Sequence, residues 1–322
     1  MRVTILGSSG QIGAYLTEYL RHLGHEVIEF DKNFDEKHDM TVIPNIKLHG
    51  AIMYSDFVFF LAFDVGGSHY LKKYQHTFGF LDNNARMMVN AFEYIQKYKK
   101  PFVFASSQMS NMSYSPYGVM KRVGELYTKS LNGLIVKFWN VYGIEKDMEK
   151  AHVITDFIKK GFETGTIDMM TDGSEHREFL YAEDCCEALE TVMQEYSAFT
   201  SDDDLHITSG SSTDILGIAR TIQSLFKENG REVSIVPAES KDEVQKDLRN
   251  EANPHIKQWW RPKTSISDGI AKVFEEIGGK VNYFGKPYPL VYNQAADAKG
   301  KKVLCIGDNL NTDIKGANIQ KF

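Results

Sequence analysis

The chain has 322 residues, of which 42% are hydrophobic and 25% are charged, and its formal net charge is -6. This composition is that of a globular protein, and it excludes a disordered chain, a collagen-like repeat and a disulfide scaffold. Because the net charge is negative, no nucleic-acid partner and no attraction to an anionic membrane are expected. The charge is uneven, since residues 278–322 carry +4 and residues 1–277 carry -10, which indicates a separate module at the C-terminal end.

In chain order, the pattern predicts a strand at Val3–Leu6, a helix at Gln11–Leu23, a strand at Glu26–Phe30, a strand at Phe57–Ala62, a helix at Asn83–Tyr98, a strand at Phe102–Ala105, a helix at Tyr117–Leu131, a strand at Leu134–Trp139, and helices near Ile154–Glu163, Ala182–Tyr196 and Ile215–Asn229. Residues 31–56 give no clear pattern. Continuous apolar strands that alternate with helices predict an α/β fold with a parallel sheet covered on both faces.

Neither a membrane segment nor a metal site is expected. The longest apolar stretch, Phe57 to Phe63, is far shorter than the ~20 residues that span a bilayer. The N-terminal apolar run is also too short for a signal peptide, so we expect a cytoplasmic protein. Three cysteines are too few for a disulfide framework and lack metal-ligand spacing, and Cys185-Cys186 is interpreted as part of a buried helix face.

A glycine-rich loop, Gly-Ser-Ser-Gly-Gln-Ile-Gly, joins the first predicted strand to the first predicted helix. Such a loop lets the backbone approach a pyrophosphate, which then meets the free N–H groups of the helix N-terminus. Asp31 closes the next strand 18 residues after Gly13, where a carboxylate can bond both hydroxyls of an adenosine ribose and would repel a 2′-phosphate. The predicted cofactor is therefore NAD rather than NADP, although a plain glycine turn is the alternative. The loop residues assigned to the cofactor are Gly7, Gly10, Gln11, Ile12 and Gly13.

Tyr117 and Lys121 are four residues apart at the start of a predicted helix, and so they share one helix face. Ser107 lies ten residues before Tyr117, just after a predicted strand. A tyrosinate can remove the proton of a carbinol hydroxyl if a nearby ammonium lowers the pKa of the phenol, and a serine hydroxyl can share the substrate oxygen. We therefore predict Tyr117 as general acid/base, Lys121 as pKa modulator and ribose ligand, and Ser107 as substrate orienter. Tyr117 and Lys121 are also assigned to the cofactor-binding residues. A purely structural role for all three is the alternative.

These motifs resemble those of the extended short-chain dehydrogenases/reductases, in particular the nucleotide-sugar epimerases and dehydratases. The resemblance runs from Arg2 to about Ile277. The matching segments are Gly7–Gly13, Asp31, Leu61-Ala62, Ser106-Ser107, Tyr117/Lys121, Asn140–Gly143, Asp172–Asp184 and Trp260–Ser265. The resemblance implies a Rossmann-type domain with a smaller C-terminal α/β substrate lobe, bound NAD and a nucleoside-diphosphate sugar as substrate.

The resemblance also assigns roles to single residues. Leu61 and Ala62 match cofactor-binding positions. Asn140 matches an asparagine that approaches the sugar diphosphate, although it could instead cap a turn. Arg177 matches an arginine that contacts the diphosphate, and a guanidinium does suit phosphate oxygens. The alternative for Arg177 is a surface salt bridge to Glu178 or Asp184.

Two departures from the family pattern bear on the reaction. The 4,6-dehydratases of this family carry an Asp-Glu pair where this chain has Gln108 and Met109, so dehydration is disfavoured. Some 3,5-epimerases place a cysteine at the position of Met109, so that activity is disfavoured too. An epimerase or dehydrogenase that oxidises one carbinol carbon, carbon 4, is the resulting prediction. The loop Phe63–His69 resembles the glycine-rich substrate loop of GDP-mannose-type epimerases, which hints at a GDP-sugar.

The expected domains are an NAD-binding domain over residues 1–150, to which later segments can return, a substrate lobe over 151–277 and an appendage over 278–322. Family members form homodimers through the two helices predicted here at Asn83–Tyr98 and Tyr117–Leu131. A non-catalytic NAD-binding sensor or scaffold is the alternative function.

The appendage resembles the last two motifs of haloacid-dehalogenase-type phosphatases. Lys286 matches the lysine that neutralises an aspartyl-phosphate, and Asp308 and Asp313 match acids that hold Mg²⁺. That family also needs a nucleophilic Asp-x-Asp after an N-terminal strand, and this sequence has none. No phosphatase activity is therefore expected of this chain alone, and a bifunctional protein with a phosphatase partner half is the further alternative.

Overall fold

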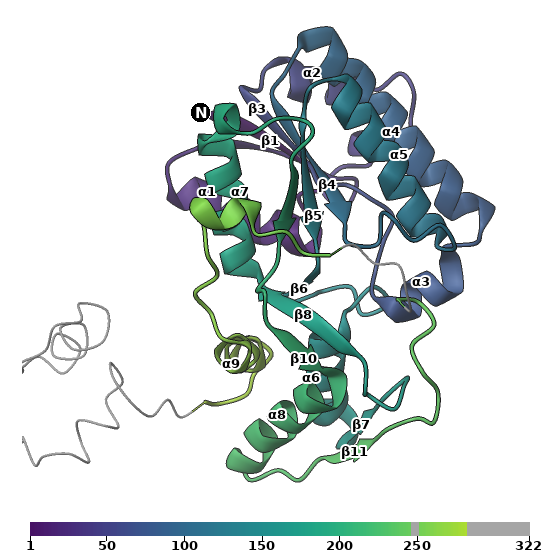
Figure 1. The fold of residues 1–322 in the computed structure, drawn as a ribbon, viewed down its shortest axis with the longest axis vertical. Helices are drawn as coiled ribbons and strands as arrows, with labels where there is room; N and C mark the ends of the chain where they lie inside the picture. Colours follow the sequence, from purple (N-terminus) through teal and green to yellow (C-terminus); the bar gives the residue numbers. More distant parts are fainter. Residues whose placement is uncertain (246–250, 282–322) are drawn as a thin grey trace, which may run out of the picture. The chain divides into compact units, whose positions relative to one another are not determined.

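The computed structural model describes residues 1–245 and 251–281. The chain forms two compact units, Met1–Ile277 and Gly278–Phe322. Every helix and strand of the described residues belongs to the first unit (Figure 1). Among these helices, none is both long enough and apolar enough to cross a membrane. The motifs that resemble a phosphatase lie outside the described residues.

Six parallel strands form the central sheet, in the order β2-β1-β3-β4-β5-β9. They are β1 (Arg2–Leu6), β2 (Glu26–Phe30), β3 (Phe57–Phe60), β4 (Phe102–Ser107), β5 (Leu134–Phe138) and β9 (Asp204–Ile207). The residues of β3, β4 and β5 are all buried. A strand that is covered on both faces is a continuous apolar run, which is why these strands were predictable. The prediction of an α/β fold with a parallel sheet is confirmed.

Helices cover both faces of this sheet (Figure 1). On one face lie α1 (Gln11–His22) and α7 (Ala182–Gln194), whose apolar side chains share one core cluster with the sheet. On the other face lie α2 (Ile46–Met53), α4 (Phe78–Tyr98) and α5 (Pro116–Ser130), around a second core cluster. Cys185 and Cys186 are fully buried on α7, as predicted. Although α7 and β9 come late in the chain, they complete the layers of the first half.

The segment between β2 and β3 differs most from a regular alternation. It holds a short 3₁₀ helix, η1 (Glu36–His38), followed by α2, and no strand occurs among residues 31–56. Asn45 caps α2, because its side-chain oxygen accepts a hydrogen bond from the backbone N–H of Leu48 at 2.9 Å. Because this segment contributes no strand, β2 is the outer strand on this side of the described sheet.

The second lobe is built from short strands. A three-stranded sheet has the order β10-β8-β6, and a two-stranded sheet pairs β11 with β7. These strands are β6 (Asn140–Tyr142), β7 (Thr166–Asp168), β8 (His176–Tyr181), β10 (Ser212–Asp214) and β11 (Ser234–Val236). The helices of this lobe are α6 (Val153–Thr164), α8 (Ile215–Glu228) and α9 (Ile266–Glu276). The remaining elements are α3 (Ser68–Tyr74), which follows β3, and the 3₁₀ helices η2 (Tyr196–Ala198) and η3 (His255–Gln258).

Candidate active site

The glycine-rich loop turns between β1 and α1. Gly7 has a φ of +90°, and a Cβ at this position would lie 2.7 Å from the backbone of Ala62, so only glycine fits there. Gly10 caps α1 with extended backbone and offers no side-chain oxygen to the first turn. A Cβ on Gly13 would lie 2.1 Å from the carbonyl oxygen of Gly7, so this glycine allows the helix to start close to the loop.

Two polar atoms of the loop are buried without a hydrogen-bond partner among the described residues. They are Oγ of Ser8 and Nε2 of Gln11. Together with the uncapped N–H groups at the start of α1, they form a set of donors around a helix N-terminus, where an anion is favoured. This donor set fits the pyrophosphate of a dinucleotide. The side chain of Ile12 points instead toward the core, where it packs against the cluster of α1 and α7.

Asp31 lies directly after β2, beside the loop. Its Oδ2 accepts a hydrogen bond from the backbone N–H of Ser9 at 3.1 Å, and its Oδ1 accepts one from the N–H of Asn33 at 3.0 Å. Asn33 also donates through Nδ2 to Oγ of Ser9 at 2.8 Å. The carboxylate is thus fixed at the edge of the glycine-rich loop. Leu61 and Ala62 follow β3, and the N–H of Leu61 donates to Leu6 of β1.

Tyr117 and Lys121 are buried on the first two turns of α5, and Ser107 ends the neighbouring strand β4. Ser115 caps the helix, because its Oγ accepts a hydrogen bond from the N–H of Gly118 at 3.2 Å. A Cβ on Gly118 would lie 2.2 Å from the carbonyl oxygen of Met109, so a glycine here brings the helix start against the loop after β4. The structure therefore brings the three predicted catalytic residues together.

Burial changes the protonation chemistry of both ionisable residues. Burial raises the pKa of Tyr117 to about 12, while a hydrogen bond with Ser107 acts in the opposite direction. Burial lowers the pKa of Lys121 to about 7, while the charge of Glu125 opposes this change. Nζ of Lys121 donates to the carbonyl oxygen of Ala105 at 2.6 Å and lies 3.7 Å from the centre of the Phe63 ring. Without a further positive charge nearby, Tyr117 therefore stays protonated at neutral pH, and little tyrosinate is present to act as a base.

Ser107 and Tyr117 face a cavity of about 770 Å³ that extends into the second lobe. A pocket of this size is within the range of sites for small-molecule ligands. Asn140, at the start of β6, and Arg177, on β8, line the same cavity. Four of the predicted site residues thus share one space. The glycine-rich segment Val65–His69 contributes another part of the wall.

Arg177 is buried, and its partner is neither of the acids that the sequence offered. Its guanidinium forms a short ion pair with Asp242, and its Nη1 donates to the carbonyl oxygen of His176 at 2.7 Å. Glu178 instead accepts from Thr208, and Asp184 accepts from the backbone of residues 263 and 264. A substrate phosphate would therefore compete with Asp242 for this guanidinium.

Several residues of the cavity wall were not predicted from the sequence. Trp139, which directly follows β5, and His152, which precedes α6, both line the cavity, as do Lys241 and Asp242. Nδ1 of His152 is 2.7 Å from Oε1 of Glu145, and this carboxylate raises the pKa of the imidazole against the opposing effect of burial. His152, Lys241 and Asp242 come from irregular segments without a motif, so no local pattern could have identified them. Trp139 directly precedes the Asn140–Gly143 segment, which was the available signal.

Gln108 and Met109 occupy the wall beside Ser107, where the dehydratases of the family carry their acid pair. Nε2 of Gln108 donates to Oε1 of Gln245 at 2.9 Å, and the N–H of Met109 donates to Oγ of Ser107 at 3.1 Å. Neither side chain can exchange a proton with a substrate near neutral pH.

Comparison with known proteins identifies the family of this chain. A model of the NAD dependent epimerase/dehydratase family matches residues 3–207. The chain belongs to this family. NAD is therefore the cofactor, as the sequence predicted. A second model, described as HAD-hydrolase-like, matches residues 283–320. This match agrees with the resemblance of the appendage to haloacid-dehalogenase-type phosphatases.

The relatives of this chain are named for different reactions. A GDP-L-fucose synthase of Sinorhizobium fredii is 29% identical over 149 residues, which cover 44% of this chain and 46% of that protein. A UDP-N-acetyl-alpha-D-glucosaminuronate decarboxylase of Bacillus cytotoxicus is 25% identical over 272 residues, which cover 73% of this chain and 83% of that protein. The first alignment thus spans about half the length of the relative.

Solved structures of family members share the fold of this chain. The UDP-glucose 4-epimerase of Thermotoga maritima with UDP-glucose has a TM-score of 0.71 at 18% identity, covering 86% of this chain and 98% of that one. The UDP-glucuronic acid 4-epimerase of Bacillus cereus, in complex with UDP-glucuronic acid and NAD, has a TM-score of 0.70 at 20% identity, covering 86% and 99%. At this level of identity the likeness concerns the fold alone.

Proposed function

We propose that this chain is an NAD-dependent enzyme that oxidises a nucleoside-diphosphate sugar at carbon 4, as an epimerase or a dehydrogenase. One observation carries the proposal: Ser107 and Tyr117 face the same cavity as Asn140 and Arg177. A hydroxyl-bearing carbon can therefore reach the phenol while a diphosphate reaches the guanidinium. The wall residues Gln108 and Met109 offer no acid or base, which argues against dehydration.

In the proposed reaction, Tyr117 removes the proton of the carbon-4 hydroxyl as hydride leaves that carbon. NAD, when bound, accepts this hydride and can return it. The ammonium of Lys121 favours the tyrosinate and so opposes the rise in pKa that burial causes, and the positive charge of a bound nicotinamide would act in the same direction. Ser107 orients the hydroxyl, and Asn140 and Arg177 hold the diphosphate. An epimerase would reduce the ketone on its opposite face, whereas a dehydrogenase would release it.

We assign the NAD-binding role to residues 1–150 together with α7 and β9, and the substrate-binding role to the rest of residues 151–277. We assign no role in this reaction to residues 278–322. A non-catalytic NAD-binding sensor would need none of the three catalytic side chains. The position of Ser107 and Tyr117 on one cavity, with Lys121 one helical turn after Tyr117, favours an enzyme. A phosphatase function would need a partner that supplies the nucleophile.

The decisive experiment incubates the purified protein and NAD with UDP-, GDP- and dTDP-sugars in deuterated water. A dehydrogenase accumulates absorbance at 340 nm. A 4-epimerase yields an isomer without deuterium and without lasting NADH, whereas deuterium in the product would reveal enolisation beside a ketone. Turnover that persists in Tyr117→Phe at the wild-type rate would overturn the proposed mechanism, and no turnover of any sugar would favour the sensor.

We also propose a homodimer formed through α4 and α5. Both helices expose large apolar side chains, among them Phe78 at 81% and Leu126 at 57% of their surface. Val89 on α4 and Val119 on α5 are exposed as well. Exposed apolar side chains on two neighbouring helices favour association of two copies. Light scattering should give a dimer mass that Leu126→Glu lowers to that of a monomer, and a monomeric wild-type protein would contradict this assignment.

A further inference from the structure

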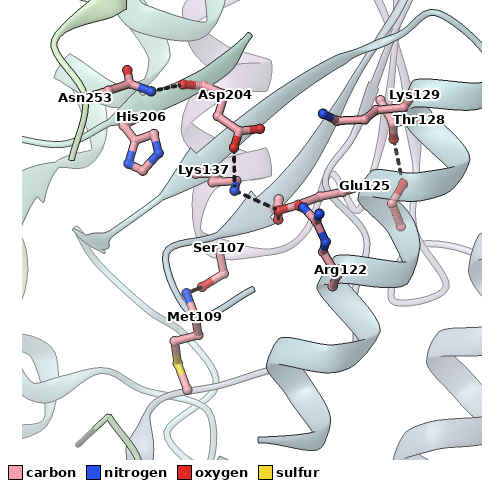
Figure 2. A network of polar contacts seen from close by, with 12 residues as sticks. Ser107, Met109, Arg122, Glu125, Thr128, Lys129, Lys137, Asp204, His206 and Asn253 are labelled. Carbon is pink, nitrogen blue, oxygen red and sulfur yellow. Dashed lines mark hydrogen bonds and ion pairs between the residues drawn. The ribbon is translucent and has the colours of Figure 1, made fainter. Parts of the chain in front are cut away.

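A cluster of charged side chains is buried where the catalytic helix α5 packs against the strands β5 and β9 (Figure 2). At its centre, Nζ of Lys137 on β5 lies 3.4 Å from Oε1 of Glu125 on α5 and 2.8 Å from Oδ2 of Asp204 on β9. Glu125 is 0% and Lys137 2% exposed. Burial of a charged side chain carries a large desolvation penalty unless the charge is paired. A buried charge cluster next to the catalytic residues therefore suggests a functional role.

The cluster is part of a series of contacts between α5 and the end of β4. Nζ of Lys121 donates to the carbonyl oxygen of Ala105, one turn after Tyr117. Glu125 follows one turn later, and its Oε1 accepts a hydrogen bond from Oγ of Ser106 at 2.5 Å. Tyr117, Lys121 and Glu125 are each four residues apart, so they share one helix face. Glu125 thus continues the row formed by the two catalytic residues.

We propose that Glu125 is a positioning residue that acts through Lys121: held by Ser106 and Lys137, it keeps a buried anion one helical turn behind the catalytic ammonium. The role given to Lys121 rests on the proposed function. The position of Glu125 itself rests on the described contacts. Arg122 reaches the same carboxylate from the surface, with Nη1 2.7 Å from Oε2 of Glu125.

The surroundings of Lys121 show why this anion matters. Its own helix presents Tyr117 and Glu125, and β4 presents the carbonyl group of Ala105. The ring of Phe63 lies 3.7 Å and that of Phe104 5.3 Å from its Nζ. Glu125 is the one acid that acts on the charge of Lys121 in the described structure, and it opposes the burial that lowers the pKa to about 7.

The sign of the effect follows from this balance. Burial favours the neutral amine, and the carboxylate favours the ammonium. If the negative charge of Glu125 is removed, Lys121 loses its proton at a lower pH. Because the tyrosinate of Tyr117 needs the ammonium beside it, activity should then decline at a lower pH on the alkaline side.

The test measures the titration of Lys121 directly in the NAD-loaded protein. With ¹³Cε-labelled lysine, the signal of Lys121 is assigned by its loss in Lys121→Met. We expect Glu125→Gln to lower the midpoint by about one pH unit or more. Glu125→Asp keeps the charge and should retain the midpoint. Arg122→Gln removes the exposed partner of the same carboxylate and serves as the control, with little change expected.

Folding must be separated from this effect. Glu125→Gln leaves Lys137 paired with Asp204. If this variant is unstable, Glu125→Gln/Lys137→Met is compared with Lys137→Met, so that the two proteins differ only in the carboxylate. Melting temperatures are recorded for each. An unchanged midpoint in a folded variant without the carboxylate would overturn the inference, as would equal shifts in Glu125→Gln and Glu125→Asp.

The same variants then give a second reading with whichever nucleotide sugar the protein turns over. In Glu125→Gln, the alkaline limb of the kcat/KM profile should move to lower pH in step with the Lys121 midpoint. A uniformly reduced profile with an unmoved limb would indicate a merely structural residue. If no sugar is turned over, the proposed function fails, while the titration of Lys121 still decides the role of Glu125.

Discussion

The NAD-binding half and the substrate lobe use the chain in different ways. In the first, each strand is four to six residues long, and functional groups lie at or directly after the carboxyl ends of β1, β2, β3 and β4. In the second, four of the five strands have three residues, and the cavity wall is assembled from distant loops. Residues at the ends of the strands are positioned by the sheet itself. The residues that line the substrate cavity depend instead on contacts such as that of Arg177 with Asp242, which joins segments 65 residues apart.

The largest effect should come from the catalytic pair of the first half. Tyr117→Phe removes the phenol that exchanges the proton, and kcat should fall by about 100-fold or more. The affinity for NAD should change little, because the cofactor loop lies on other elements. Steady-state kinetics and NAD titration measure the two quantities. Tyr127→Phe, at an exposed tyrosine on the same helix, is the matched control and should keep wild-type activity.

The substrate lobe should respond through binding instead. Arg177→Lys keeps a charge but loses the planar guanidinium, so KM for the nucleotide sugar should rise by roughly tenfold while kcat changes less. Asp242→Asn should act in the opposite direction, because it releases the guanidinium from its ion pair. Initial rates over a range of substrate concentrations distinguish these outcomes. A lower kcat at constant KM in Arg177→Lys would place Arg177 with the chemistry rather than with binding.

The cofactor site offers a third and smaller effect. Asp31→Asn weakens the acceptor for the ribose hydroxyls and removes the charge that repels a 2′-phosphate. The Kd for NAD should rise by about tenfold, and the preference for NAD over NADP should shrink. Fluorescence titration with both cofactors measures this. Asp35→Asn, at an exposed acid four residues on, should leave both affinities unchanged, and an unaltered preference in Asp31→Asn would argue against the predicted contact.

The joint between the two regions should give the smallest effect, on stability. Nε1 of Trp139 donates to Nδ1 of His206 at 3.1 Å, and burial together with Lys137 lowers the pKa of His206 to about 4. The unfolded chain therefore binds a proton that the folded chain refuses between about pH 6.5 and 4, so stability should decline as pH falls through this window.

Thermal melts between pH 7 and 4 test this decline. His206→Asn removes the titrating group and should flatten that part of the profile. His22→Asn, at an exposed histidine, should keep the wild-type slope. Equal slopes in the wild type and in His206→Asn would show that other groups cause the loss.

The sequence predicted much of this architecture because buried parallel strands and amphipathic helices leave local patterns. The catalytic set was recognisable for the same reason, since Ser107, Tyr117 and Lys121 belong to adjacent elements. Three helices were not anticipated, α2, α3 and α9. All three follow irregular segments, and α2 and α3 are also short. α4 begins at Phe78, five residues before the expected start, with Thr77 as its cap.

The partner of Arg177 was beyond local reasoning. Glu178 and Asp184 were close in sequence, but Glu178 accepts a hydrogen bond from Thr208 and Asp184 holds the backbone before α9. Tertiary packing decides which acid pairs with a buried guanidinium. The motif around Arg177 contains the arginine but not Asp242, its partner.

The missing strand between β2 and β3 has a consequence for how copies of this protein avoid one another. Within the described residues, β2 has an open row of backbone hydrogen-bonding groups, which could template pairing with another sheet. The charges on this strand oppose such pairing: Glu26 is bound to Arg2, and Glu29 to Arg21. Replacing both glutamates by valine would give β2 an apolar, uncharged edge and should make the protein more prone to aggregate through this strand.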